Sequence, residues 1–263
     1  MSFISKYISE KNKNNEKVLS VFLTAGFPDR DNFSDLAIRA LNAGADMLEI
    51  GFPFSDPLAD GPVIQHSSHA AIESGINLKN VFQSIKEIRQ ETDKPLIMMG
   101  YANPVLTFGI NNFVQHAKEA GANGVIIPDV PIEEYDSFFD NSFDGLDVIL
   151  LITPTTSKER VKIIDKKSSG FVYCVSVSGT TGIANQHMND TIQFLKDTHS
   201  SVEKNKMLVG FGISNKNDAR NFSPYCDGII VGSAIIKSLM NDDNNFKKTL
   251  ELIKNLKDGL QKN

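Results

Sequence analysis

Two carboxylates stand near each other where a short apolar segment runs into a proline-rich loop. The segment Met47–Gly51 alternates as a β-strand does, so Glu49 lies on the face opposite Leu48 and Ile50. If Glu49 faces the interior of the fold, desolvation raises its pKa and suits the side chain both to deliver and to remove protons. The structural alternative is a strand-end glutamate in a salt bridge with a neighbouring arginine.

The second carboxylate lies in the loop that follows this segment. Residues 53–62 contain three prolines and two aspartates, Asp56 and Asp60. Prolines make such a loop stiff yet sharply turned, which suits holding a carboxylate over a pocket. For either aspartate, turn formation or helix capping is the alternative role.

Three glycine-rich segments late in the chain suggest an anion site. They are Ser178–Gly182, Gly210–Ser214 and Gly232–Ala234. Glycines let backbone N–H groups approach an anion closely, and the late loops of α/β barrels often bind phosphate together with the start of a short helix. Glycine also simply ends strands, but three such segments in this order favour a phosphate site.

Residue types that would support other chemistry are missing or scattered. None of the expected strands carries a lysine, so a Schiff-base nucleophile has no obvious source. His66 and His69 are three residues apart on an expected helix, which favours packing or a surface position over metal binding. Cys174 and Cys226 lie in separate apolar segments and are expected to be buried and free. We therefore expect neither a metal site nor a Schiff base.

The composition is that of a water-soluble globular protein. The 263 residues are 41% hydrophobic and 22% charged, and no apolar stretch approaches the ~18 residues of a membrane span. The formal net charge is −5, and no block of Lys or Arg is longer than a pair, so the sequence predicts no binding of nucleic acid or membranes. The polar start Met1–Lys6 lacks the apolar core of a signal peptide, which predicts a cytoplasmic protein.

Short apolar segments alternate with stretches of helical periodicity along the whole chain. The expected strands are Val18–Thr24, Met47–Gly51, Pro95–Tyr101, Gly124–Pro128, Asp147–Thr153, Gly170–Val177, Met207–Gly212 and Asp227–Val231. The expected helices include Phe33–Asn42, Leu78–Arg89, Asn111–Ala120, Lys158–Lys166, Asp190–Thr198 and Phe246–Leu260. Such alternation implies parallel strands, and eight units predict a (β/α)8 TIM barrel, a single catalytic domain over residues 1–263. An open doubly wound sheet gives the same alternation, but the turn at residues 24–28 lacks the Gly-rich pattern of dinucleotide-binding sheets.

Two smaller features support the barrel. The segment before Val18 is partly amphipathic, with apolar Phe3, Ile4, Tyr7 and Ile8, and is expected to form a helix that caps the bottom of the barrel. The sequences at residues 42–46 and 119–123, NAGAD and EAGAN, resemble each other. Both are typical of a glycine helix cap that leads into a strand.

The run from Glu49 to Pro62, EIGFPFSDPLADGP, closely resembles the signature of the tryptophan synthase α chain. Similar segments follow in order at residues 22–26, 100–104, 128–131, 170–173, 181–182, 210–213 and 232–234. The resemblance implies a lyase of L-tryptophan biosynthesis that splits indole-3-glycerol phosphate into indole and glyceraldehyde 3-phosphate by retro-aldol chemistry. An indole ring protonated at C3 would then supply the electron sink that a lysine or a metal provides elsewhere.

The resemblance also implies roles for individual residues. Glu49 matches the catalytic acid/base, Asp60 the carboxylate that engages the indole N–H, and Tyr173 a neighbouring active-site tyrosine. The matches to the phosphate site are Gly182, Gly212, Gly232 and Ser233, and Thr181 is a further implied substrate-binding residue. The residues implied near the indole ring are Phe22, Met99, Tyr101 and Phe211. The chain departs from the family pattern at residues 177–178, where Val-Ser replaces a frequent Arg-Ala.

By the same resemblance, the partner is the tryptophan synthase β chain in an α2β2 heterotetramer. Pyridoxal phosphate is expected in that partner, and no cofactor is expected in this chain. Asp56 and Pro57 are expected at the tip of the loop that meets the partner.

Three alternatives stay open at this point. Another phosphate-binding barrel, such as a pathway isomerase or indole-glycerol-phosphate synthase, would be expected to use a strand-end lysine or an Asp and Cys pair, which this sequence lacks. A non-catalytic subunit that only activates a partner would have no need of both Glu49 and Asp60. A stand-alone indole-producing lyase is the third.

Overall fold

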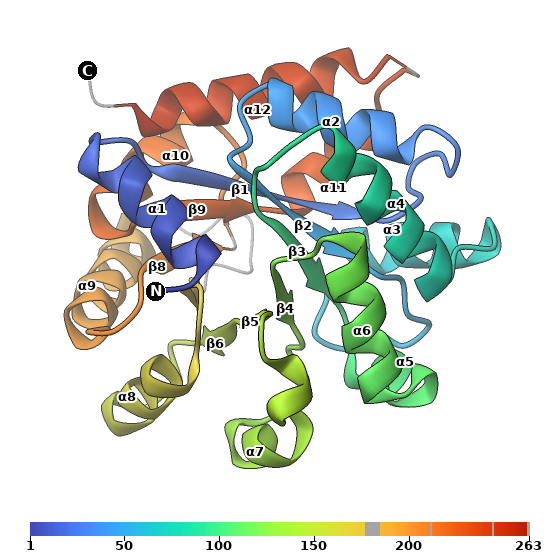
Figure 1. The fold of residues 1–263 in the computed structure, drawn as a ribbon. Coiled ribbons are helices and arrows are strands. Elements are labelled where there is room, and N and C mark those ends of the chain that lie inside the picture. Colours follow the sequence, from blue (N-terminus) through green and yellow to red (C-terminus); the bar gives the residue numbers. More distant parts are fainter. Residues whose placement is uncertain (177–184, 211, 244, 262–263) are drawn as a thin grey trace.

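Nine parallel strands form one sheet that winds into a nearly closed barrel (Figure 1). The computed structural model describes residues 1–176, 185–210, 212–243 and 245–261, without the side chains of residues 185–188. Around the barrel the strands follow the order β5-β4-β3-β2-β1-β9-β8-β7-β6. Their bounds are β1 (Val18–Thr24), β2 (Met47–Gly51), β3 (Leu96–Met99), β4 (Gly124–Ile126), β5 (Asp147–Val148), β6 (Leu150–Ile152), β7 (Val172–Val175), β8 (Met207–Gly210) and β9 (Gly228–Val231).

Helices surround the barrel and connect successive strands (Figure 1). Their bounds are α1 (Phe3–Lys13), α2 (Phe33–Asn42), α3 (Pro62–Glu73), α4 (Leu78–Gln90), α5 (Ala102–Phe108), α6 (Ile110–Ala120), α7 (Tyr135–Phe138), α8 (Lys158–Lys167), α9 (Asn185–Ser201), α10 (Lys216–Phe222), α11 (Ser233–Leu239) and α12 (Lys247–Leu260). The predicted (β/α)8 barrel with an N-terminal capping helix is therefore confirmed. In the described part of the chain, no helix is both long and apolar enough to cross a membrane.

The fifth predicted strand, Asp147–Thr153, is wrong as a single continuous element. It is divided into β5, which pairs with β4, and β6, which pairs with β7. Two serine hydroxyls explain the division. Ser169 Oγ accepts a hydrogen bond from Val148 N at 2.8 Å, and Ser168 Oγ accepts one from Leu150 N at 3.1 Å, where a neighbouring strand would offer carbonyl oxygens.

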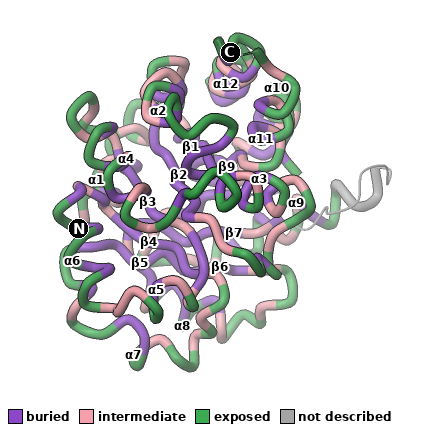
Figure 2. Tube along the Cα trace, turned by 90° about the vertical axis from the view of Figure 1, so that its right-hand side faces the viewer, coloured by how far each residue is buried: buried purple, intermediate pink, exposed green. Residues whose placement is uncertain are grey.

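Side chains alternate along the strands between two apolar layers. On β1, Leu19, Val21 and Leu23 pack in the layer between sheet and helices, whereas Val18 packs in the barrel interior. In Figure 2 the buried trace follows the strands, and exposed segments lie on loops and outer helix faces. Burial of both sheet faces explains why the strands read as nearly continuous apolar runs. A polar residue within such a strand therefore needs a specific reason.

Helix α1 closes the amino-terminal end of the barrel, as predicted. Ile4 and Ile8 are fully buried and pack among the interior residues of the strands. Tyr7 packs partly buried against the same layer, whereas Phe3 is 47% exposed and stays outside it. The barrel interior is thus apolar at this end, so we expect the polar residues of an active site at the opposite end.

Polar side chains repeat where three strands begin at the closed end. Each accepts a hydrogen bond from the backbone N–H of a neighbouring strand: Asp46 from Leu19, Asn123 from Leu96 and Asp227 from Met207, at 2.8, 2.9 and 2.9 Å. Two of them follow the glycines of the repeated segments, Gly44 and Gly121, which have positive φ angles of 128° and 92°. The resemblance between residues 42–46 and 119–123 therefore reflects a recurring way of starting a strand.

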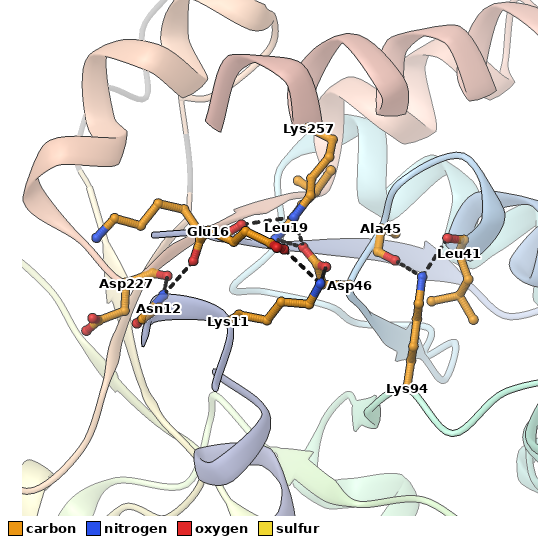
Figure 3. Close-up of polar contacts among 11 residues, drawn as sticks. Lys11, Asn12, Glu16, Leu19, Leu41, Ala45, Asp46, Lys94, Asp227 and Lys257 are labelled. Carbon is orange, nitrogen blue, oxygen red and sulfur yellow. Dashed lines mark hydrogen bonds and ion pairs between the residues drawn. The ribbon is translucent and has the colours of Figure 1, made fainter. Parts of the chain in front are cut away.

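Asp46 also links both terminal helices to the sheet (Figure 3). Its carboxylate pairs with Lys257 of α12 at 2.5 Å and with Lys11 of α1 at 3.6 Å, although its side chain is only 5% exposed. Lys94 lies nearby and donates to the carbonyl oxygens of Leu41 and Ala45, both at 2.8 Å. Removal of one partner would leave the remaining charges of this cluster uncompensated, so breaking the cluster should be strongly destabilising.

Candidate active site

A cavity lies at the carboxyl end of the barrel, opposite α1. It has about 600 Å³ of space, including its open mouth, and the strand ends of β1, β2, β3, β7 and β9 contribute to its wall. The lining residues are Phe22, Glu49, Asp60, Gly61, Ile64, Met99, Tyr173, Gly212, Ile213, Ile230, Gly232 and Ser233. Most residues predicted for the site from the sequence are therefore brought together in one place.

Glu49 is fully buried in the wall of this cavity. Its Oε1 accepts a hydrogen bond from Ser20 Oγ at 2.8 Å, whereas Oε2 has no hydrogen-bond partner within the described part of the chain. Burial raises the pKa of Glu49 to about 8, although the hydrogen bond from Ser20 acts to lower it. At neutral pH the side chain is therefore a neutral acid that can donate a proton into the cavity. The alternative of a salt bridge to arginine is wrong, since no arginine among the described residues pairs with either carboxyl oxygen.

Asp60 reaches the same cavity from the loop after β2. Burial raises its pKa, and a hydrogen bond from Tyr101 acts in the opposite direction. The Tyr101 hydroxyl donates to Asp60 Oδ2 at 2.9 Å and accepts from Ala59 N at 3.0 Å. Tyr101 was predicted beside the indole ring, and the structure places its hydroxyl on Asp60. These two hydrogen bonds fix the end of the loop and orient the Asp60 carboxylate.

Tyr173 of β7 lies almost wholly inside the barrel, with 5% of its surface exposed. Burial raises its pKa well above the ordinary range, and the neighbouring Glu49 and Asp60 add to the effect, so the hydroxyl stays protonated. A Cβ atom on Gly210 would come within 2.3 Å of the tyrosine hydroxyl oxygen. The glycine at the end of β8 therefore makes room for Tyr173.

The predicted phosphate residues divide into two groups. Gly212, Gly232 and Ser233 line the cavity that holds Glu49, and Ser233 is the first residue of α11. Gly212 has a φ of 75°, a backbone conformation that favours glycine. Gly182 lies outside the described residues, as do Thr181, residues 177–178 and Phe211, the last of which was predicted near the indole ring.

The loop that carries Asp60 has its tip at a different residue from the one predicted. Pro57 is buried, whereas Leu58 is 91% exposed and Asp56 is exposed beside it. The expectation that Pro57 is displayed at the tip is therefore wrong. In this loop Leu58, and not Pro57, is the apolar residue that is accessible from outside.

A second cavity adjoins the first and shares Asp60, Met99 and Tyr173 with it. Its other lining residues are mostly apolar: Ala59, Ile127, Pro128, Val130, Pro131, Ile132, Leu150, Leu151, Thr153, Thr156, Arg160, Ile164 and Val175. Both cavities are lined mostly by apolar residues, with a few polar groups among them. Such a lining is typical of a site that binds a small organic ligand.

Metal ligands and reactive thiols are not gathered anywhere in the described part of the chain. No group of three or more His, Cys, Asp or Glu side chains there is placed to hold a metal ion. His66 packs edge-on against Phe27, with the ring centroids 6.3 Å apart. Cys174 and Cys226 are buried and free, as predicted.

Some of the residues that line the cavity were not predicted from the sequence. Ile64, Ile213 and Ile230 line the wall as apolar surface, and nothing in their local sequence distinguishes them from core residues. Ser20, which bonds Glu49, had a visible signal: it is a polar residue within an apolar strand, as Glu49 is.

A parallel barrel whose open end gathers a buried glutamic acid with a raised pKa, an aspartate and glycine loops in one cavity is typical of enzymes of the (β/α)8 class. Residues 8–262 match the family model described as the tryptophan synthase alpha chain. The α chain of Petrotoga mobilis is 42% identical over 258 residues, with 97% of this chain and 98% of that one covered. The α chain of Flavobacterium psychrophilum is also 42% identical, over 234 residues, with 88% and 92% covered.

Solved structures agree with these sequence relatives. The structure of tryptophan synthase subunit alpha from Legionella pneumophila is similar with a TM-score of 0.91 and 32% identity, covering 99% of this chain and 98% of that one. The chain belongs to the tryptophan synthase alpha chain family. It is therefore a lyase that serves tryptophan biosynthesis as an α subunit and works with a β chain. Membership of this family excludes the alternative that the chain is a different phosphate-binding barrel, such as a pathway isomerase or indole-glycerol-phosphate synthase.

Proposed function

We propose that this chain cleaves indole-3-glycerol phosphate into indole and glyceraldehyde 3-phosphate, with Glu49 as acid and base. The observation that carries the proposal is the state of Glu49 in the cavity wall: fully buried, with a pKa of about 8, and with Oε2 lacking a hydrogen-bond partner among the described residues. A carboxylic acid that is neutral at physiological pH and has a free oxygen is suited to protonate a carbon atom.

In the first step Glu49 donates its proton to C3 of the indole ring, and the ring nitrogen becomes positively charged. The Asp60 carboxylate, oriented by Tyr101, stabilises this charge by accepting the N–H hydrogen bond. Glu49 is now a carboxylate. It removes the proton of the hydroxyl on the adjacent side-chain carbon, the carbon–carbon bond breaks, and its electrons return to the ring as the aldehyde forms.

The surroundings of the two carboxylates support binding of such a substrate. Phe22 and Met99 supply apolar surface for the ring, and Tyr173 lines both this cavity and the second one. Gly212, Gly232 and Ser233 offer backbone N–H groups to the phosphate, and Gly182 completes the phosphate site. Thr181 also binds the substrate, and Phe211 lies near the indole ring. Binding energy from the phosphate then positions the reacting carbon atoms.

In this proposal the reaction in this chain needs neither a metal ion nor a Schiff base. No lysine occurs in any of the nine strands, and the electron sink is the substrate's own ring. Pyridoxal phosphate belongs to the β chain, which receives the indole in an α2β2 assembly. We propose the exposed Leu58 as a contact with that partner, and the cytoplasm as the location of the complex.

The proposal is tested by incubating the purified chain with indole-3-glycerol phosphate and quantifying both products. Indole and glyceraldehyde 3-phosphate should appear in equal amounts, unaffected by a strong chelator or by borohydride, and faster after addition of a β chain. Chelator sensitivity would contradict the metal-free mechanism. Absence of indole both with and without the β chain would contradict the proposed reaction.

A further inference from the structure

Ser20 and Glu49 form a polar pair in an otherwise apolar region of the barrel. Strands β1 and β2 pair in a register that sets Ser20 beside Met47 and Phe22 beside Glu49. On the other side, Ser20 lies beside Ile230 of β9. Both neighbours at the level of Ser20, Met47 and Ile230, belong to the apolar interior layer.

A hydroxyl in this position needs a partner. Ser20 is fully buried, and burial of an unpaired hydroxyl costs free energy that an alanine of nearly the same size would not. Its Oγ donates to Glu49 Oε1 at 2.8 Å, although the strand register sets Ser20 opposite Met47, two residues before Glu49. Packing alone would accept an alanine, so the hydroxyl points to a role connected with Glu49.

The bond makes the two carboxyl oxygens of Glu49 unequal. Oε1 is occupied by Ser20, whereas Oε2 is buried without a hydrogen-bond partner among the described residues. We infer that Ser20 is a positioning residue for the lyase reaction: it holds Oε1 so that Oε2 is the oxygen that exchanges the proton with the substrate. This inference rests on the acid/base role of Glu49 proposed above.

Ser20 acts through Glu49 and does not touch the substrate, because it is not among the residues that line the cavity. The titratable groups that face Glu49 from the surrounding elements are Tyr173 of β7 and Asp60 of the loop after β2. Both lie on the cavity side. Ser20 approaches from the closed side of the barrel, and it stabilises the carboxylate that forms after proton transfer.

The test compares Ser20→Ala with wild type in steady-state cleavage over a range of pH. We expect kcat to fall about tenfold, as for loss of a hydrogen bond to a charged group, with KM changed less than about twofold. Because cleavage begins with protonated Glu49, activity is lost as pH rises through its pKa. Without the hydrogen bond from Ser20 that pKa is higher, so the alkaline limb should move up by about one pH unit. Ser20→Cys, with a weaker donor, should give an intermediate shift.

Thr249→Val is the matched control. Thr249 is also fully buried, and its hydroxyl also donates to a carboxylate, Asp242 Oδ2, at 2.8 Å, but it lies on α12. It should leave kcat and the alkaline limb unchanged. A structural effect of losing any buried hydroxyl would instead appear in both variants.

A carbon-13 NMR titration of the Glu49 carboxyl group, assigned with Glu49→Gln, separates this inference from the proposed function. If wild type releases no indole but the pKa of Glu49 is still higher in Ser20→Ala, the proposed cleavage reaction is wrong. The interaction of Ser20 with Glu49 is then still supported. An unchanged titration with unchanged kcat overturns the role of Ser20 whatever the substrate. If Ser20→Ala does not fold, the same two measurements on Ser20→Cys decide the question.

Discussion

Replacing Glu49 with glutamine should remove cleavage and at the same time stabilise the fold, increasingly so as pH rises. Burial raises the pKa of Glu49 from its ordinary 4.5 to about 8. Between these values the folded protein holds a proton that the unfolded chain has released. The free energy of unfolding of wild type therefore falls as pH rises through this interval.

The size of the effect follows from the two pKa values. Each pH unit within the interval lowers the free energy of unfolding by about 1.4 kcal/mol, so the full penalty above the folded pKa is about 5 kcal/mol, and about 3 kcal/mol is present at neutral pH. Glutamine has the same size and does not ionise. It can still accept the hydrogen bond from Ser20, so the variant should be more stable than wild type by these amounts.

Urea unfolding of both proteins at about pH 5, 7 and 9 measures the difference directly. The difference should be small at the lowest pH and should rise through neutrality toward its alkaline limit. Cleavage should fall by at least about a thousandfold with substrate binding near normal, because only proton transfer is removed. A stability difference that does not change with pH would refute a neutral buried Glu49. Activity within about tenfold of wild type would refute its role in proton transfer.

Four further outcomes follow from the same structure. Gly232→Val should raise KM about tenfold or more with a smaller change in kcat, since the side chain would obstruct a backbone that lines the cavity. Asp46→Ala should lower the free energy of unfolding by about 3–5 kcal/mol in urea titrations, whereas Asp35→Ala, which breaks an exposed pair, should change it by less than about 0.5 kcal/mol. Tyr101→Phe removes a hydrogen bond that lowers the pKa of Asp60, so kcat/KM should begin to decline at a higher pH than in wild type as pH falls. Leu58→Asp should weaken activation by the β chain about tenfold in a titration, with the activity of the isolated chain retained.

The sequence predicted best those elements whose signals are local. The bounds of β1, β2 and α2 agree with the prediction because apolar alternation, helical periodicity and terminating glycines are all read within one segment. The division of the fifth strand was missed because its cause lies elsewhere in the chain. The hydroxyls of Ser169 and Ser168 accept hydrogen bonds from Val148 and Leu150, which lie about twenty residues earlier in the chain. In the sequence, nothing distinguishes these two serines from ordinary loop residues.

The site shows the same division between local and distant causes. Glu49 was conspicuous as a charged residue in an apolar strand, and the loop with Asp60 as a dense run of prolines and aspartates. The contact between Tyr101 and Asp60 joins residues separated by 41 positions and could not be read from either segment. The exposure of Leu58 and the burial of Pro57 depend on how the loop turns, which composition does not determine.

The pairing of Ser20 with Glu49 depends on the stagger between two strands. A serine in β1 and a glutamate in β2 are each visible as polar residues in apolar runs, but their relative height in the barrel is fixed by the strand register. A shift of two residues that set Ser20 beside Ala45 would move the hydroxyl away from Glu49 and leave Oε1 without this partner. The chemistry of the acid thus follows from closure of the whole barrel, because that closure determines which strand residues meet at each level.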